Sequence, residues 1–97
     1  MQNTQEILDT ITRSKQYLSA TYKLQSVGVF GSVIRGEHHE GSDVDVLVDL
    51  GAQTDLLDLI GIGQYLEERL LVKVDVVPRI TLRPELMEQV LREVRYL

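Results

Sequence analysis

The segment that most constrains the fold is residues 27–49, in which two short apolar stretches flank a polar connection. The second stretch reads DVDVLVD, which alternates carboxylate and aliphatic side chains with the two-residue period of a strand that has one apolar face. Gly31 and Ser32 end the first stretch, and ten residues separate Ser32 from Asp43. Because Asp43 and Asp45 are two apart, a strand places both carboxylates on the same face. Aspartate is a poor strand former, so strand propensity does not explain why two aspartates stand at these positions.

Apolar spacing predicts helices before, between and after the strands. Asn3 and Glu6 have the spacing of a capping box, which favours a helix start at this point. Thr54 or Asp55 is suited to cap the next long helix, and Pro84 fits the first turn of the last one. The expected elements are a helix ending near residue 22, a strand over 27–30, a helical turn over 32–35, a strand over 43–49, a helix over 56–70, a strand over 72–77 and a helix from 84 to 97.

The lengths of the connections predict how the strands pair. A helix joins the second strand to the third, so these two are expected to be parallel neighbours with a right-handed connection. The link between the first two strands is too short for a full crossover, which favours an antiparallel pair. We therefore expect an α/β (α+β) fold in which helices pack on a small mixed three-stranded sheet, with residues 1–97 forming a single domain.

Composition excludes several classes of function. The net charge of -5 argues against direct nucleic-acid binding, which normally requires a basic face. The chain contains no cysteine, which excludes disulfides and thiolate metal sites. Its two histidines, His38 and His39, are expected to be exposed loop residues rather than ligands. The N-terminus is polar and no apolar run approaches the ~20 residues of a membrane span, so we expect a cytoplasmic protein.

A third acidic residue, Asp75, interrupts the aliphatic third strand. Its neighbours Val74 and Val76 must face the other way, so Asp75 faces either solvent or the side of the aspartate pair. Three carboxylates on one patch would repel one another and raise one another's pKa, and a divalent cation removes that repulsion. Oxygen ligands without cysteine favour Mg²⁺ or Mn²⁺. The alternative is that Asp43 and Asp45 are the solvated face of an edge strand, where charges discourage aggregation.

The turn at Gly31 and Ser32 is a candidate phosphate-binding site. Glycine lets the backbone approach a ligand closely, and Ser32 begins a helical turn whose N–H groups and hydroxyl can bind phosphate. Combined with the carboxylates, this turn predicts metal-assisted phosphoryl or nucleotidyl transfer, with two ions on a triphosphate. Arg35 is equally suited to steady the triphosphate or to pair with Glu37.

These residues resemble a known signature. Gly31-Ser32, ten residues, then Asp43-x-Asp45, with a third aspartate on a later strand, is similar to the DNA polymerase β-type nucleotidyltransferase superfamily. The strings GSVIRG and SDVDVLV, followed by LLDL and VDVV, resemble its minimal nucleotidyltransferase (MNT) branch over nearly the whole chain. The resemblance implies a polymerase β-like nucleotidyltransferase fold. It also implies an antitoxin that uses ATP and Mg²⁺ to transfer AMP to a tyrosine of a HEPN-domain ribonuclease toxin, and so silences it.

The resemblance also implies roles for individual residues. The nucleotide-binding residues would be Gly31, Ser32, Arg35 and Ser42. The catalytic and metal-binding residues would be Asp43, Asp45 and Asp75. Asp75 would in addition assist deprotonation of the acceptor hydroxyl. The sequence departs from the family pattern at residues 71–72, where many members carry a glycine.

Two other functions fit the same residues. An antitoxin could neutralise its toxin by binding alone, although a complete set of serine and aspartates counts against a degenerate site. A nucleotidyltransferase could instead modify a small molecule. The short chain favours a protein acceptor, because it has no additional segment that would hold a large acceptor by itself.

Overall fold

A four-stranded mixed sheet forms the centre of the computed structural model, which describes residues 3–52 and 54–97. The strands are β1 (Ser26–Phe30), β2 (Val44–Asp49), β3 (Val74–Pro78) and β4 (Arg95–Tyr96), in the spatial order β3-β2-β1-β4. Strand β2 is antiparallel to β1 and parallel to β3. Both pairings confirm the prediction made from the connection lengths, and the mixed α/β class is confirmed as well.

Helices start where the capping residues predict. They are α1 (Thr4–Tyr22), α2 (Ser32–Arg35), α3 (Leu56–Leu70) and α4 (Pro84–Glu93), with a 3-10 turn η1 (Arg79–Thr81) before α4. Asn3 and Glu6 form the reciprocal capping box of α1. Of the two candidates for the cap of α3, Asp55 is the one whose side chain accepts from the backbone, at Leu57 N–H. The cap therefore satisfies a donor that the first turn leaves free.

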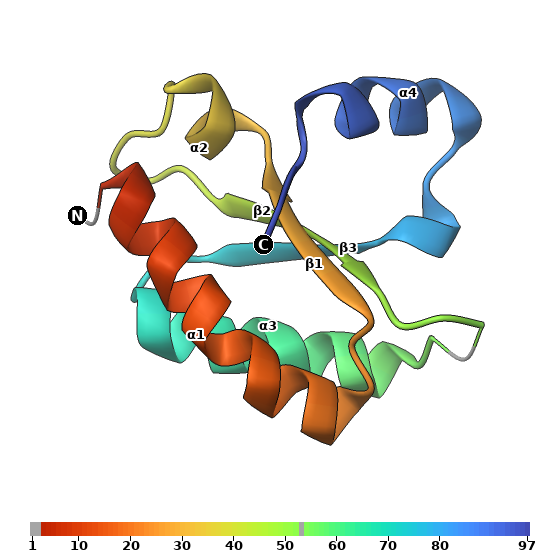
Figure 1. Ribbon diagram of the computed structural model, residues 1–97. Coiled ribbons are helices and arrows are strands. Elements are labelled where there is room, and N and C mark those ends of the chain that lie inside the picture. The colour runs from red at the N-terminus through yellow and green to blue at the C-terminus, as the bar shows by residue number, and fades with distance from the viewer. Residues whose placement is uncertain (1–2, 53) are drawn as a thin grey trace.

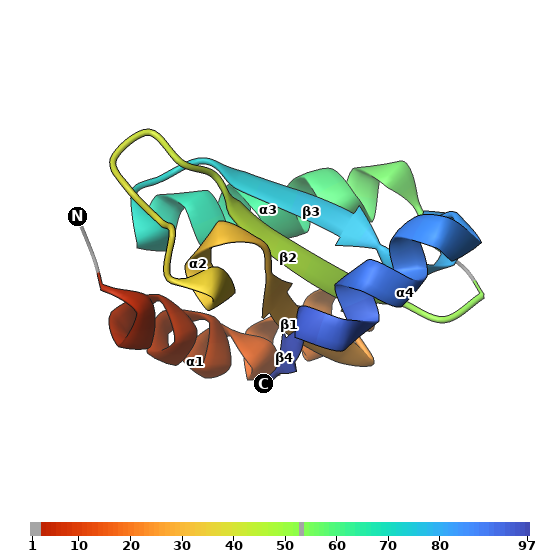
Figure 2. The same cartoon turned by 90° about the horizontal axis from the view of Figure 1, so that it is seen from above.

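Helices α1 and α3 cover one face of the sheet, while α4 lies on the opposite side (Figures 1 and 2). The core between α1, α3 and the sheet is aliphatic, and its fully buried members include Ile7, Ile11, Leu18, Val27, Val29, Val44, Val46, Ile62 and Leu66. Side chains alternate along β2, so those that point away from this core lie on the other face of the sheet, near α4. Across residues 3–52 and 54–97, no helix is both long and apolar enough to cross a membrane.

The end of the chain differs from the prediction. The last helix was expected to reach residue 97, but α4 ends at Glu93 and the chain then pairs with β1 as the fourth strand. Val94 has the extended backbone angles φ -61° and ψ 135°. Gly28 permits this pairing, because a Cβ at that position would come within 2.6 Å of the Val94 side chain. The expected three-stranded sheet is therefore wrong by one strand.

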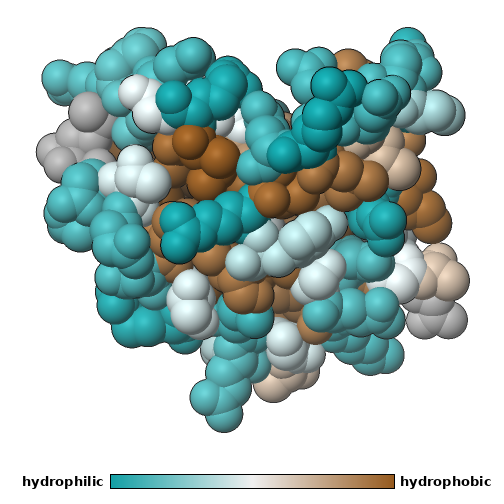
Figure 3. All heavy atoms as spheres, turned by 45° about the horizontal axis from the view of Figure 1, so that its top comes forward, coloured by the Kyte–Doolittle hydropathy of each residue, from teal (hydrophilic) through white to brown (hydrophobic). Residues whose placement is uncertain are grey.

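Large apolar side chains remain exposed on the last third of the chain. Ile80 in η1 and Leu86 and Leu91 in α4 are exposed, and Figure 3 shows apolar surface beside the polar outer side of α4. Among the residues of α4, only Val90 is buried. This part of the molecule thus presents apolar surface that the chain itself does not cover, as interaction surfaces do.

The third strand begins at Val74, two residues later than predicted, because α3 ends in a left-handed residue. Leu71 caps α3 with φ 59°, a conformation that costs a residue with a Cβ roughly 1–2 kcal/mol. The departure from glycine at residues 71–72 therefore falls on a position whose geometry favours glycine.

Replacing Leu71 with glycine is expected to stabilise the protein. The Leu71 side chain is 84% exposed, so little burial is lost. Relief of the left-handed strain, less the greater chain entropy of glycine, leaves a gain of about 0.5–1 kcal/mol. Urea unfolding would measure it as a higher midpoint. Leu71→Ala is the matched control, because it removes the same side chain but keeps the Cβ; an equal gain in this variant would show that strain is not the cause.

Candidate active site

Asp45 and Asp75 lie directly opposite each other on neighbouring strands. They are register partners in the parallel β2–β3 pair. Val44 and Val46 on either side of Asp45 are buried in the core, so the two carboxylates lie on the other face of the sheet. Asp45 is half-buried and Asp75 is exposed. Asp75 therefore lies on the side of the aspartate pair and is open to solvent as well.

The environment of Asp45 is unfavourable for a negative charge. Burial raises the pKa of its carboxyl group above the ordinary value, and the nearby charges of Asp75 and Asp43 raise it further. Asp43 comes immediately before β2 and completes the acidic group. Within residues 3–52 and 54–97, no three acidic or histidine side chains stand in ready-made metal-binding geometry. Even so, three repelling hard oxygen donors fit a divalent cation such as Mg²⁺ in their chemistry.

Gly31 holds the backbone directly over this acidic group. Its angles, φ 78° and ψ -149°, fall in a region that essentially only glycine adopts. A Cβ at Gly31 would collide with the carboxylate of Asp45. Ser32 then begins α2, and the Gly31 carbonyl accepts from the N–H groups of Ile34 and Arg35. The structure thus brings the Gly31-Ser32 turn and Asp45 into contact, as their roles in one site would require.

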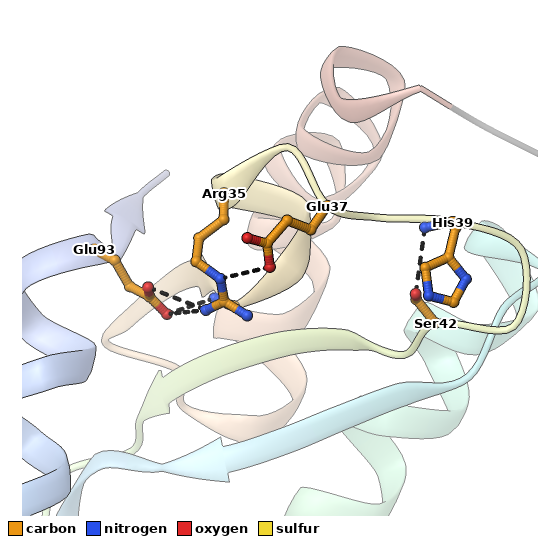
Figure 4. Close-up of polar contacts among 6 residues, drawn as sticks. Arg35, Glu37, His39, Ser42 and Glu93 are labelled. Atoms are coloured by element: carbon orange, nitrogen blue, oxygen red, sulfur yellow. Dashed lines mark hydrogen bonds and ion pairs between the residues drawn. The ribbon is translucent and has the colours of Figure 1, made fainter.

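Arg35, in the last turn of α2, lies between two glutamates (Figure 4). Its Nε donates to Glu37 at 3.1 Å, and its Nη1 donates to the two oxygens of Glu93 at 3.1 and 3.2 Å. The hydrogen bonds that it donates to Glu37 and then to Glu93 raise the pKa of the guanidinium group. The pairing with Glu37 is one of the two alternatives expected for Arg35. It does not prevent Arg35 from binding a triphosphate, which is the other alternative.

Glu93 is a site neighbour that sequence reasoning missed. It ends α4, and its Oε1 also accepts the N–H of Gly31 at 2.9 Å. In the sequence it is one of several charged residues between apolar positions of a helix, so helical periodicity assigns it to the solvated face. The signal that could have found it was the break in the helix before Val94, and that break depends on pairing with a distant strand.

The loop between α2 and β2 contains the remaining candidates. The hydroxyl of Ser42 accepts from the His39 backbone N–H at 3.3 Å, so in this structure Ser42 orders its own loop (Figure 4). His39 is exposed, as expected. His38 differs from the expectation: its two ring nitrogens are buried and, among the described residues, have no hydrogen-bond partner. Sequence polarity alone does not reveal this burial of the ring nitrogens.

A glycine-containing turn over paired carboxylates, on a mixed sheet flanked by helices, defines a site suited to nucleoside triphosphates and divalent metal. Comparison with known families agrees. The family described as "Nucleotidyltransferase domain" matches residues 11–97, so the chain belongs to the nucleotidyltransferase-domain family.

Individual relatives extend this assignment. The protein adenylyltransferase MntA of Thermococcus cleftensis is 41% identical over 92 residues, which cover 95% of this chain and 93% of the relative. A solved structure described as a candidate minimal nucleotidyltransferase superposes with a TM-score of 0.83 at 41% identity, covering 99% of this chain and 97% of the other. A crystal structure of a toxin-antitoxin with AMP-PNP superposes with a TM-score of 0.73 at 27% identity, covering 87% and 69%.

Proposed function

We propose that this chain is an antitoxin that acts as a protein adenylyltransferase. It transfers AMP from ATP to a tyrosine hydroxyl of a cognate HEPN ribonuclease toxin, in the cytoplasm. The observation that carries the proposal is the juxtaposition of Asp45, Asp75 and the Gly31-Ser32 turn on one face of the sheet. The similarity to a named protein adenylyltransferase and to a toxin-antitoxin structure with an ATP analogue supports it.

Asp43, Asp45 and Asp75 would hold Mg²⁺, with two ions expected. When bound, the metal neutralises the carboxylates and stabilises negative charge on the attacking and leaving oxygens. The raised pKa of Asp45 supports this assignment, because burial and neighbouring carboxylates disfavour its negative charge and a bound cation would stabilise that charge.

The remaining residues would bind and orient the nucleotide. Gly31 and Ser32 would bring the backbone close to the triphosphate, Arg35 would bind its oxygens, and Ser42 is a further candidate contact from the loop. The acceptor hydroxyl oxygen forms a bond to the α-phosphorus while the α–β bridge bond breaks, so that pyrophosphate leaves. Asp75 is the most exposed of the three carboxylates and is therefore best placed to take the proton of an incoming tyrosine.

Asp75 is exposed, so the acidic face of the sheet is open to an acceptor hydroxyl that a partner would bring. Ile80, Leu86 and Leu91 offer apolar surface on η1 and α4, and Glu93 links α4 to the turn of the site. A protein that covers this apolar surface could present a side chain to the site. Direct nucleic-acid binding is not expected from a chain with a net charge of -5.

Labelled ATP provides a sharp test of the proposed reaction. The purified chain, Mg²⁺ and the cognate toxin are incubated with ATP labelled on either the α- or the γ-phosphorus. Nucleotidyl transfer predicts label on the toxin from the α-position only, and its loss on adding EDTA. Label from the γ-position would indicate phosphorylation and would contradict the proposal. Absence of label from a toxin that is nevertheless inhibited would favour neutralisation by binding alone, and label on a small molecule would favour the third function.

A further inference from the structure

Glu93 occupies an unusual place for a glutamate at the end of a helix. Its side chain is 20% exposed, whereas that of Glu88, on the same helix, is 74% exposed. One carboxylate oxygen accepts both the Gly31 N–H and an N–H of Arg35, and the second oxygen accepts from Arg35 as well. Glu93 thus joins the last helix to two residues of the candidate nucleotide site that lie about 60 positions earlier in the chain.

The bond to Gly31 continues the hydrogen-bonding edge of β1. Gly28 and Val29 pair with the backbone of β4, but the chain leaves the strand arrangement at Val94 as it runs back into α4. At Gly31 the acceptor is the side chain of Glu93 instead. Because Gly31 holds a conformation that essentially only glycine adopts, and holds it over Asp45, a fixed acceptor for its N–H restrains the turn in that position.

The bonds to Arg35 fix the direction of its guanidinium group. Glu37 engages Nε and Glu93 engages Nη1. In the part of the chain that the structure describes, neither an ion pair nor a hydrogen bond engages Nη2, which points away from Glu93 in Figure 4. The planar guanidinium can bind anions through two parallel N–H groups, so holding one edge determines where the other is presented.

We propose that Glu93 is a positioning residue for nucleotide binding, which acts through Arg35 and the Gly31 turn without touching the nucleotide. The proposal rests on the proposed function, because it concerns the same site. Arg35 neutralises the charge of Glu93, so the proximity of Glu93 to a triphosphate need not weaken nucleotide binding. If Glu93 instead occupied the place of a phosphate, removing its charge would strengthen nucleotide binding.

The test is Glu93→Gln, which replaces the carboxylate with an amide. This variant keeps an oxygen acceptor for the Gly31 N–H but loses the ion pair with Arg35. With Mg²⁺ and AMP-PNP as the probe, calorimetry is expected to show roughly tenfold weaker binding, with a matching rise in KM for ATP, little change in kcat and an unchanged melting temperature. In an Arg35→Ala background the same substitution should add little further loss. Glu88→Gln, on the same helix, should bind like the unaltered protein.

Three results would overturn the role of Glu93: tighter binding in Glu93→Gln, binding equal to that of the unaltered protein, or an equal loss in the Arg35→Ala background together with a lower melting temperature. The last result would assign Glu93 to structure alone. Binding of AMP-PNP is measured without toxin, so it decides the role of Glu93 even if the labelled-ATP experiment rejects AMP transfer. The two proposals can therefore fail separately.

Discussion

Asp45→Asn is expected to abolish AMP transfer while making the protein more resistant to heat. The substitution removes a carboxylate that would hold metal, so the rate should fall by at least roughly 10²–10³-fold. It also removes a half-buried charge: burial raises the pKa of Asp45, and repulsion from Asp75 and Asp43 raises it further. The gain in thermal stability and the loss of activity then share one cause, which is a charge kept for function.

The sign of the pH dependence follows from the raised pKa. A carboxyl group that is harder to ionise in the folded state favours folding below its unfolded pKa, and this contribution is lost as pH rises through the folded value. The stabilising effect of Asp45→Asn should therefore be present at neutral pH, should shrink as the pH falls through the raised folded pKa of Asp45, and should be lost below the unfolded value of about 3.9. Thermal melts at several pH values would measure it.

Two further comparisons make the Asp45 prediction specific. Mg²⁺ with AMP-PNP should raise the melting temperature of the unaltered protein and leave that of Asp45→Asn nearly unchanged. Asp9→Asn is the matched control, because Asp9 is an exposed acid on α1 that bonds to Gln5. Normal transfer by Asp45→Asn, or loss of transfer that merely accompanies unfolding, would remove Asp45 from the proposed site.

Gly31→Ala is expected to destabilise the fold and to eliminate activity together. A side chain at φ 78° and ψ -149° is strained, and its Cβ would collide with Asp45. Backbone strain and overpacking each cost about 1–3 kcal/mol, which predicts a loss of roughly 2–6 kcal/mol in the free energy of unfolding. The turn would also move away from the carboxylates that it now overlies.

Gly36→Ala separates the two contributions to this loss. Gly36 has a similar φ of 75°, but a Cβ there would meet no atom of the described residues within 4 Å. Urea unfolding of this variant should therefore show only the conformational cost, about 1–2 kcal/mol. If both variants lost the same free energy, contact between the turn and Asp45 would not be what requires glycine at position 31.

The central part of the site could be predicted from the sequence because its geometry is local. Asp43 and Asp45 share a face through strand alternation, and the short helical crossover between β2 and β3 makes those strands parallel neighbours. Once these strands pair, the valines on both sides of Asp75 pack toward the core, so Asp75 lies on the same face as Asp45. Local patterns also located the capping box at Asn3.

The contribution of the chain's last five residues could not be predicted in this way. Apolar residues continue at helical spacing as far as Leu97, so no local signal ends the helix at Glu93. The break is stabilised by pairing with Gly28 and Val29, which are distant in the sequence. Glu93 reaches Gly31 and Arg35 only because of that pairing. Tertiary contacts thus override the helical pattern at the point where the last helix meets the site.

Intact mass spectrometry of the cognate toxin tests the central claim most directly. The toxin is incubated with ATP, Mg²⁺ and either the unaltered chain or Asp45→Asn, and then weighed whole before fragmentation locates any adduct. The proposed reaction predicts a gain of one or more AMP units on a tyrosine with the unaltered chain and no gain with Asp45→Asn. A toxin of unchanged mass that is still neutralised on mixing would contradict AMP transfer.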